Sequence, residues 1–148
     1  MLSDLDALIE QSTSQQEILH RFDVYACAQL ARFSEARSTE KHRYIRVAKE
    51  YVDAHLAENI SLNDIANIVY MNPAYFSTLF KKVTGQNFVD YLQKVRIKEA
   101  QNLLSNTHMP ISEIAEKTGY KSAHYFSKVF LKAVGIKPTE YRRLYSNQ

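Results

Sequence analysis

The stretch NFVDYLQKVRIKEAQNLL, residues 87–104, determines how the rest of this chain is arranged. Its apolar residues recur at helical spacing with no Gly or Pro between them, which predicts one uninterrupted α-helix. Asn87 is suited to cap the start of this helix, and Asp90 occupies the place of the acidic residue in a capping box. At about 1.5 Å per residue, the helix would be about 27 Å long.

The segments before and after this helix are copies of one another. Asp64-Ile65-Ala66 recurs 49 positions later as Glu113-Ile114-Ala115. From there on the offset is 50, and it relates Tyr75, Phe76, Ser77, Phe80, Lys82, Gly85 and Tyr91 to Tyr125, Phe126, Ser127, Phe130, Lys132, Gly135 and Tyr141. We place a turn where the offset changes, and predict that each copy is a helix, a turn and a second helix.

Composition narrows the class of protein. The chain of 148 residues suggests one domain with an extension, and only three Gly and three Pro favour an all-α fold. The single cysteine, Cys27, excludes an internal disulfide and a Cys-based zinc site, and it fits a reducing compartment. No apolar run reaches the 18 residues of a membrane span, and the acidic N-terminus lacks the basic start of a signal peptide. We expect no membrane partner, metal or cofactor.

The net charge of +3 hides a difference between the two parts of the chain. Residues 1–60 carry 7 Lys or Arg against 10 Asp or Glu, whereas residues 61–148 carry 12 against 6. The basic part is the part that contains the repeat. Its excess of positive charge favours a polyanionic partner.

The N-terminal 41 residues are expected to form a helical extension. Residues 1–12 look amphipathic and acidic, and the capping box that begins at Ser14 predicts a helix with Ile18, Leu19, Phe22, Tyr25, Ala26 and Leu30 on one face. That face would pack on the rest of the chain or on a second copy, as in a homodimer through residues 1–40; the alternative is a linker helix that carries a signal from an upstream domain. Residues 34–41 are small and polar, and we treat them as a boundary.

Capping residues and glycines divide residues 42–148 into further helices. After a helix at 42–59, the first helix-turn-helix unit, about 61–85, has Ser61 and Asn72 as caps and Gly85 at its end. The second unit, about 110–135, follows Pro110, with Gly119 ending its first helix, Ser122 capping its second and Gly135 ending that. A last helix is expected from Thr139 to Tyr145.

The second helix of each unit has one apolar and one polar face. The inward residues are expected to be Phe76, Leu79, Phe80 and Val83, and Phe126, Val129, Phe130 and Ala133. The outward residues are small or basic: Ala74, Ser77, Thr78 and Lys81, and Ala123, His124, Ser127, Lys128 and Leu131. A DNA major groove admits one α-helix whose side chains read base edges, and these faces are suited to it. Except for Leu131, we take these residues as base contacts.

Phosphate contacts are expected from the helix starts at Asn72 and Ser122, where free backbone N–H groups suit an anion, and from the nearby cations Lys82, Lys121, Lys132 and Arg142. Two helices that enter one face of straight DNA must lie about 34 Å apart, one helical turn. The 87–104 helix with its flanking offsets can provide that separation. One chain would then do what a helix-turn-helix dimer does with two, so the DNA site need not be palindromic.

The stretch from about Val47 to Arg143 resembles the DNA-binding domain of the AraC/XylS family of transcription regulators. The resemblance is carried by Ile65-Ala66, Tyr75-Phe76-Ser77, Phe80-Lys81-Lys82, Gly85, Tyr91-Leu92, Arg96, Ala100, Ile114-Ala115, Gly119-Tyr120, Tyr125-Phe126-Ser127-Lys128, Phe130, Gly135, Pro138 and Tyr141-Arg142. It implies a homeodomain-like domain of seven helices over residues 42–148, in which outward residues of helices 73–83 and 122–134 contact bases in successive major grooves. It also implies a bacterial cytoplasmic protein that works on the nucleoid with RNA polymerase.

The sequence departs from the family at three of the outward positions. The family often has Arg where this chain has Thr78 and Lys128, and a lysine where it has Leu131, so bidentate reading of guanine by Arg is absent. Ala74 or Leu131 could meet a thymine methyl instead. The N-terminal helix resembles the segment that precedes this domain in two-component response regulators, and we hypothesise that the chain is the output end of one.

Two other functions compete with DNA binding. A helical module that docks another protein would have the same fold. An enzyme is disfavoured, because no nucleophile elbow, P-loop or metal constellation occurs, and Cys27 lies in an amphipathic helix where it is expected in a core.

Overall fold

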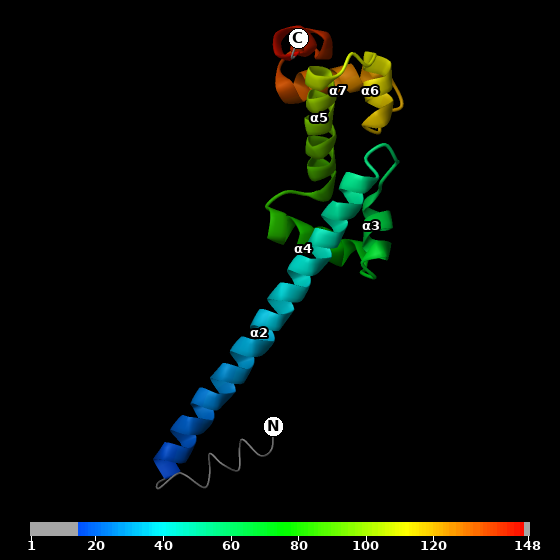
Figure 1. Cartoon of the computed structure of the whole chain (residues 1–148). Coiled ribbons are helices and arrows are strands. Elements are labelled where there is room, and N and C mark those ends of the chain that lie inside the picture. Colours follow the sequence, from blue (N-terminus) through cyan, green and yellow to red (C-terminus); the bar gives the residue numbers. More distant parts are fainter. Residues whose placement is uncertain (1–14, 147–148) are drawn as a thin grey trace. The chain divides into compact units, whose positions relative to one another are not determined.

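The computed structural model describes residues 15–146 and is all-α there, as predicted (Figure 1). Its helices are α2 (Gln15–Ala54), α3 (Leu62–Ile68), α4 (Pro73–Thr84), α5 (Phe88–Asn106), α6 (Ile111–Lys117), α7 (Ala123–Val134) and α8 (Pro138–Tyr145). The amphipathic segment expected at 1–12 and the cap expected at Ser14 lie outside the described residues. Between residues 15 and 146 no helix is both long and apolar enough to cross a bilayer.

The prediction of separate helices on either side of residues 34–41 is wrong. α2 runs through this segment without a break and ends at Ala54, before the predicted Asn59. The polar residues support helix rather than ending it: the Thr39 hydroxyl donates to the carbonyl of Glu35 at 3.0 Å, and Arg43 pairs with Glu40 at 3.7 Å. Polar composition alone therefore did not distinguish a solvated helix from a linker. By its internal contacts the chain divides into residues 1–43 and 44–148, and each part is described separately.

In the N-terminal part, the described side chains of α2 are mostly exposed. Leu19, Phe22, Val24, Leu30 and Phe33 are each more than half exposed. Cys27 is exposed as well, so the expectation that it lies in a core is not met within this part.

The C-terminal part has two separate hydrophobic cores. The first unites the end of α2 with α3, α4 and the start of α5: Ile45, Ala48, Val52, Ile60, Ile65, Ala66, Val69, Phe76, Leu79, Phe80, Phe88 and Leu92. The second unites the rest of α5 with α6 and α7: Ile97, Ala100, Leu104, Ile114, Ala115, Tyr120, Phe126 and Phe130. Helix α5 contributes to both cores, which meet between Leu92 and Ile97, so it is the shared support of the two helix-turn-helix units.

The internal repeat is visible in how the aromatic rings pack. Phe80 meets Tyr91 edge-on with ring centroids 5.3 Å apart, and the residues 50 positions later, Phe130 and Tyr141, meet at 5.5 Å. All four phenylalanines of α4 and α7, the second helices of the two units, are fully buried, as predicted: Phe76, Phe80, Phe126 and Phe130. Ala133, predicted to face inward, is exposed, because Val134, four residues after Phe130, continues the inward face of α7 and packs against the second core instead.

The caps form where the sequence predicts them. Ser61 and Asp64 make a reciprocal capping box, and their hydrogen bonds lower the pKa of the Asp64 carboxyl. Asn87 accepts from the N–H of Asp90 at 2.8 Å and fixes the start of α5. These caps make each helix begin at a defined residue, and so set the phase of its exposed face.

Both turns between the helices of a unit close in the same way. The N–H of Met71 donates to the carbonyl of Ala66, and that of Tyr120 to the carbonyl of Ala115, both at 2.8 Å. The residue before each donor has a left-handed backbone: Tyr70 with φ +54° and Gly119 with φ +81°. Tyr70 is 97% exposed, so nothing crowds its unusual conformation.

Candidate nucleic-acid interface

Helix α4 presents a small, weakly charged outer face. Ala74, Thr78 and Lys81 are exposed, whereas Ser77 is half-buried. The Thr78 hydroxyl donates to the carbonyl of Ala74 at 3.1 Å, which leaves its oxygen lone pairs directed away from the helix as acceptors. The chemistry that this face offers is therefore one acceptor hydroxyl, one methyl group and one terminal cation.

Helix α7 presents a bulkier and more basic face at the corresponding positions. His124, Lys128 and Leu131 are exposed, and Ala123 and Ser127 are half-buried. The Ser127 hydroxyl donates to the carbonyl of Ala123 at 2.8 Å. Compared with α4, an imidazole replaces a methyl group, a lysine replaces a threonine, and a leucine replaces a lysine.

The starts of the two helices differ in what they can offer to an anion. At α4, Pro73 has no N–H, and the N–H groups of Ala74 and Tyr75 both donate to the Asn72 side chain, at 2.9 and 3.4 Å. That of Phe76 donates to the carbonyl of Asn72. The first turn of α4 thus has no unengaged N–H group, contrary to the expectation of free donors there. At α7 the Ser122 hydroxyl accepts from Tyr125 at 3.3 Å.

Three of the four expected phosphate-binding cations are exposed, and one is used inside the fold. Lys82 in the last turn of α4, Lys132 in the last turn of α7 and Lys121 just before α7 are all exposed. Arg142 is half-buried, and its Nη2 donates to the carbonyl of Met109, in the loop before α6. Its guanidinium holds α8 against that loop, so less of it is available for a phosphate.

Several exposed aromatic residues on these units were not predicted as site residues. Tyr75 and Tyr125 occupy equivalent places in the first turns of α4 and α7, and both are more than half exposed. The signal was present in the sequence: the tyrosine recurs in both copies, yet it lies outside the apolar face at i, i+3, i+4 and i+7. Tyr70 gave no such signal, because its counterpart is Gly119.

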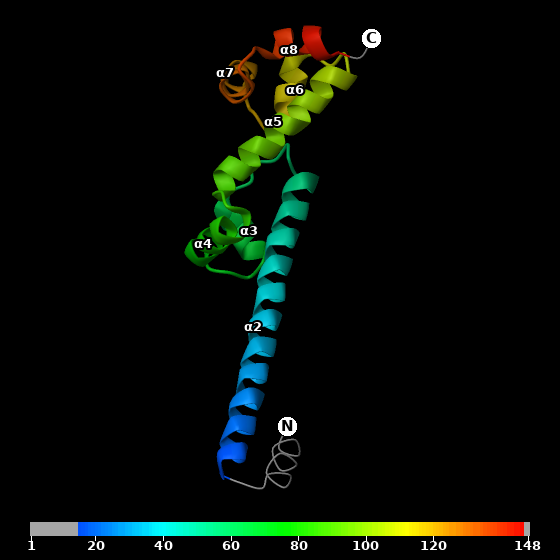
Figure 2. The ribbon, with the colours of Figure 1, turned by 90° about the vertical axis from the view of Figure 1, so that its left-hand side faces the viewer.

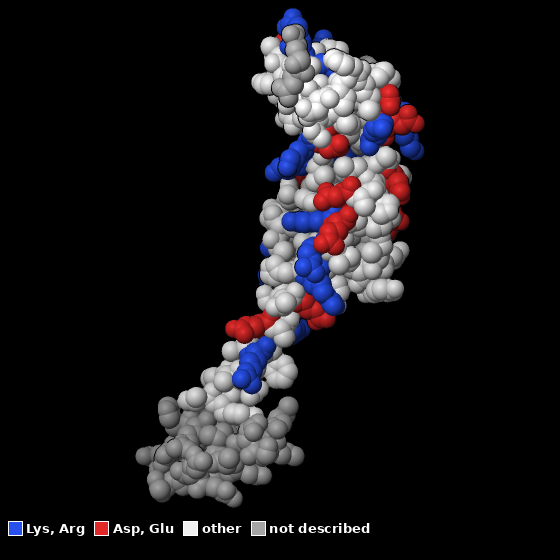
Figure 3. Space-filling view, in the orientation of Figure 1, with Lys and Arg blue, Asp and Glu red and all other residues white. Residues whose placement is uncertain are grey.

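Helices α4 and α7 lie at opposite ends of α5 and on the same side of it, the left-hand side of Figure 2. Their outer faces remain exposed at the residues given above. Basic and acidic side chains are interspersed on the face drawn in Figure 3. Charge on that face therefore does not by itself identify the binding surface, and the recognition helices have to be identified from their repeat and exposure.

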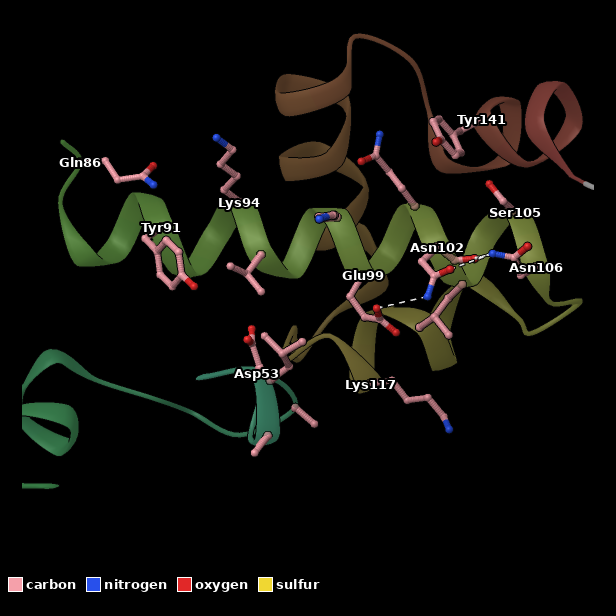
Figure 4. A pocket seen from close by; sticks show the side chains of 17 residues that line it. Asp53, Gln86, Tyr91, Lys94, Glu99, Asn102, Ser105, Asn106, Lys117 and Tyr141 are labelled. Atoms are coloured by element: carbon pink, nitrogen blue, oxygen red, sulfur yellow. Dashed lines mark hydrogen bonds between the residues drawn. The ribbon is translucent and has the colours of Figure 1, made fainter. Parts of the chain in front are cut away.

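An open groove runs along a different face of α5 (Figure 4). It extends from Gln86 and Tyr91 to Tyr141, with the end of α2 and Lys117 at its sides. Lys94 and Lys117 face it together with Asp53 and Glu99, so it carries both signs of charge. None of the expected base or phosphate contacts lines it, and the described residues contain no group of His, Cys, Asp or Glu that could hold a metal ion.

Comparison with known proteins identifies the family. Residues 65–144 match the model of a helix-turn-helix domain. The regulatory protein PocR of Salmonella typhimurium is 37% identical over 99 residues, which are 67% of this chain and 33% of that protein. The arabinose operon regulatory protein of Escherichia coli is 35% identical over 99 residues, 66% of this chain and 34% of that protein. AdaA of Bacillus subtilis, a bifunctional transcriptional activator and DNA repair enzyme, is 32% identical over 101 residues, 68% of this chain and 48% of that protein.

Solved structures share the fold. The C-terminal domain of AraT, a response regulator from Geobacillus stearothermophilus, is 37% identical with a TM-score of 0.69, covering 71% of this chain and 88% of that one. The DNA-binding domain of the transcriptional factor AdpA, solved with a target DNA, is 26% identical with a TM-score of 0.66, covering 68% of this chain and 91% of that one. The chain spans about a third of the length of PocR and of the arabinose regulator. With its two helix-turn-helix units on one connecting helix, it belongs to the AraC-type helix-turn-helix family of transcription regulators.

Proposed function

We propose that this chain binds specific sequences of double-stranded DNA as part of a transcription regulator, with α4 and α7 reading successive major grooves. The observation that carries the proposal is the repeat itself: two units present the same helix, each with an exposed outer face, on one side of a shared helix. Residues 42–148 form the DNA-binding domain in this proposal. A docking module for another protein would not need two copies of the same exposed helix on one side of a shared support, whereas two helices that enter one face of straight DNA do need such an arrangement.

The two helices would read different chemistry. On α7, Lys128 and His124 supply donors, which suit the O6 and N7 acceptors of guanine. On α4, Thr78 supplies an acceptor for the amino group of adenine or cytosine, with Ala74, Ser77 and Lys81 beside it. We infer that the two halves of the DNA site differ in sequence, and that the half read by α7 is the richer in guanine.

Phosphate contacts would hold both helices in place. Lys82 and Lys132 occupy equivalent positions at the ends of α4 and α7, and Lys121 precedes Ser122 at the start of α7. Asn72 would contribute its amide group, because the N–H groups of the following turn are engaged. The guanidinium of Arg142 already donates to the carbonyl of Met109 within the fold, so less of it is available for a phosphate.

Lys128→Ala is expected to relax base preference in one half of the site, by about 1–3 kcal/mol of discrimination for the base it reads. Lys82→Ala is expected to weaken all sequences alike and to reduce the slope of log affinity against log salt by about one. Duplexes selected from a random pool, followed by titrations at several salt concentrations, measure both effects. If Lys128→Ala left affinity and base preference unchanged, α7 would bind through another face.

The alternative function, a helical protein–protein interaction module without DNA binding, makes a different prediction for the same experiment. Such a module would show neither a steep loss of duplex affinity with added salt nor a sequence preference. We propose no catalytic activity for the chain. Within a longer protein it would act as the output domain of a two-component response regulator, in the bacterial cytoplasm at the nucleoid, with RNA polymerase as a protein partner.

We also propose that α2 brings two chains together through residues 1–40. Leu19, Phe22, Ala26, Leu30 and Phe33 follow one another at steps of three or four residues, so they lie within one narrow stripe of the helix. All but Ala26 are more than half exposed. A continuous apolar stripe on a helix is the pattern that a second copy can cover.

Phe33→Glu is expected to convert the dimer into a monomer, and so to halve the molecular mass measured in solution. The substitution places a charge in the apolar stripe of α2, which is the proposed seam between the two chains. Val24→Glu is the matched control: Val24 is equally exposed but lies on the opposite side of the helix by its position in the sequence. Sedimentation equilibrium over a range of concentrations measures both. A monomeric wild type, or dimers that are lost equally in both variants, would contradict the proposed seam.

A further inference from the structure

Arg96 connects the two helix-turn-helix units. It lies on α5 between Leu92, in the first core, and Ile97, in the second. Its Nη2 donates to the carbonyl of Glu58 at 2.6 Å, and Glu58 belongs to the segment that leads from α2 into the first unit. Its guanidinium carbon lies 5.8 Å from the ring centre of Tyr120, which is buried in the second unit. One side chain therefore contacts both the segment that leads into the first unit and the second unit itself.

A second contact joins the same two segments beside Arg96. A Cβ added to Gly119 would lie 2.4 Å from the carbonyl oxygen of Leu56 and 2.5 Å from Nη2 of Arg96. The turn of the second unit thus lies directly against residues 56–58, which precede the first unit. Gly119 permits this approach because it has no side chain. Arg96 is half-buried there, and desolvation lowers the pKa of its guanidinium.

These contacts differ in kind from the rest of the packing. Each unit is held on α5 by apolar side chains, and apolar burial has little directional preference. A hydrogen bond from a guanidinium to a carbonyl fixes both distance and direction. Helix α5 sets how far apart the units lie, but contacts such as those of Arg96 are needed to fix how each is turned about that helix.

We propose that Arg96 is a positioning residue that fixes the orientation of α7 relative to α4, and thereby determines which spacing between two DNA half-sites the protein accepts. The proposal rests on the proposed function. One inserted base pair turns a half-site by about 35° around the DNA axis. A rigid pair of recognition helices cannot follow that rotation, whereas a loosely held pair can.

Spacing preference is the first test. The preferred duplex of the wild type is selected from a random pool, and versions with one base pair added or removed between the half-sites are compared. We expect the wild type to lose about tenfold in affinity or more, as for loss of one base-pair contact. Arg96→Met keeps the side-chain length without its donors, and should bind the three spacings within about threefold of one another. Lys98→Met, an exposed residue on the same helix, is the matched control and should keep the wild-type preference.

A measurement without DNA is the second test. Cysteines are placed at Asn63 on α3 and Glu116 on α6, both exposed, after Cys27→Ser removes the native thiol. Spin labels at the two sites, in labelled chains diluted with unlabelled protein, report the distance between the units within one chain. We expect one narrow distance in the wild type and in Lys98→Met, and a broad distribution in Arg96→Met. Arg96→Lys, which keeps the charge but not the planar fork, should lie between them.

The outcomes separate the two proposals. A distance distribution that stays narrow in Arg96→Met, or affinity that falls by the same factor at every spacing, overturns the positioning role. A broadened distribution in a protein whose wild type shows no sequence-specific binding supports the orienting contact and overturns the proposed function. If Arg96→Met loses helicity by circular dichroism, the comparison is made with Arg96→Lys.

Discussion

Replacing Phe130 by alanine is expected to lower the free energy of unfolding of the second helix-turn-helix unit by about 3–5 kcal/mol. Phe130 is fully buried, packs on Phe126 with ring centroids 5.6 Å apart, and meets Tyr141 edge-on at 5.5 Å. The ring thus links α7 with α8, and alanine would leave a cavity that neither helix can fill. Thermal unfolding followed by circular dichroism measures the loss.

The two separate cores make this prediction more specific. Phe130 belongs to the second core only, so amide exchange in α6 and α7 should accelerate more than exchange in α3 and α4. Phe80→Ala should show the reverse, because Phe80 belongs to the first core. Tyr125→Ala, which removes an exposed ring from α7, is the control and should cost little. Uniform acceleration in both units would contradict the division into two cores.

Gly119→Ala is expected to be the most damaging of the three glycine substitutions. A left-handed backbone costs an alanine about 1–2 kcal/mol, and the close approach of the Leu56 carbonyl adds an overpacking cost of about 1–3 kcal/mol. Gly85 and Gly135 have similar φ values, +78° and +89°, but a Cβ there would meet nothing within 4 Å. Their alanine variants should therefore show the backbone cost alone.

Urea unfolding of the three variants measures the difference directly. Equal losses of unfolding free energy for all three variants would mean that the segment around Leu56 moves away without cost. The contact between the second unit and residues 56–58 would then contribute nothing to stability. A loss confined to Gly119→Ala would instead mean that the two helix ends tolerate a side chain in the left-handed region. The expected order is a large loss for Gly119→Ala and two smaller, similar ones.

Most of the C-terminal fold could be predicted because its signals are local. Caps at Ser61, Asn72, Asn87 and Ser122 and the ends at Gly85 and Gly135 depend on residues only a few positions apart, and the structure places them as predicted. Because the units are repeated, each helix of one unit could also be predicted from its counterpart in the other unit. The continuous helix across 34–41 was missed because a solvated helix and a polar linker have the same composition.

The candidate site was predictable in outline but not in its details. Helical phase identified the outer faces of α4 and α7, because it follows directly from where each helix begins. The roles of Arg96 and Arg142 could not be read in the same way, since each donates to a carbonyl more than thirty positions away along the chain. A basic residue in a basic sequence gives no sign of which partner its guanidinium will meet.

The two left-handed turns, at Tyr70 and Gly119, give the halves of this duplicated protein unequal freedom to diverge. Tyr70 stands almost entirely in solvent, so that turn accepts a bulky residue and could accept others. Gly119 is enclosed by Leu56 and Arg96, so its turn accepts almost nothing else. The two turn residues are therefore interchangeable in one direction only. Glycine could replace Tyr70 in the first unit, but tyrosine could not replace Gly119 in the second.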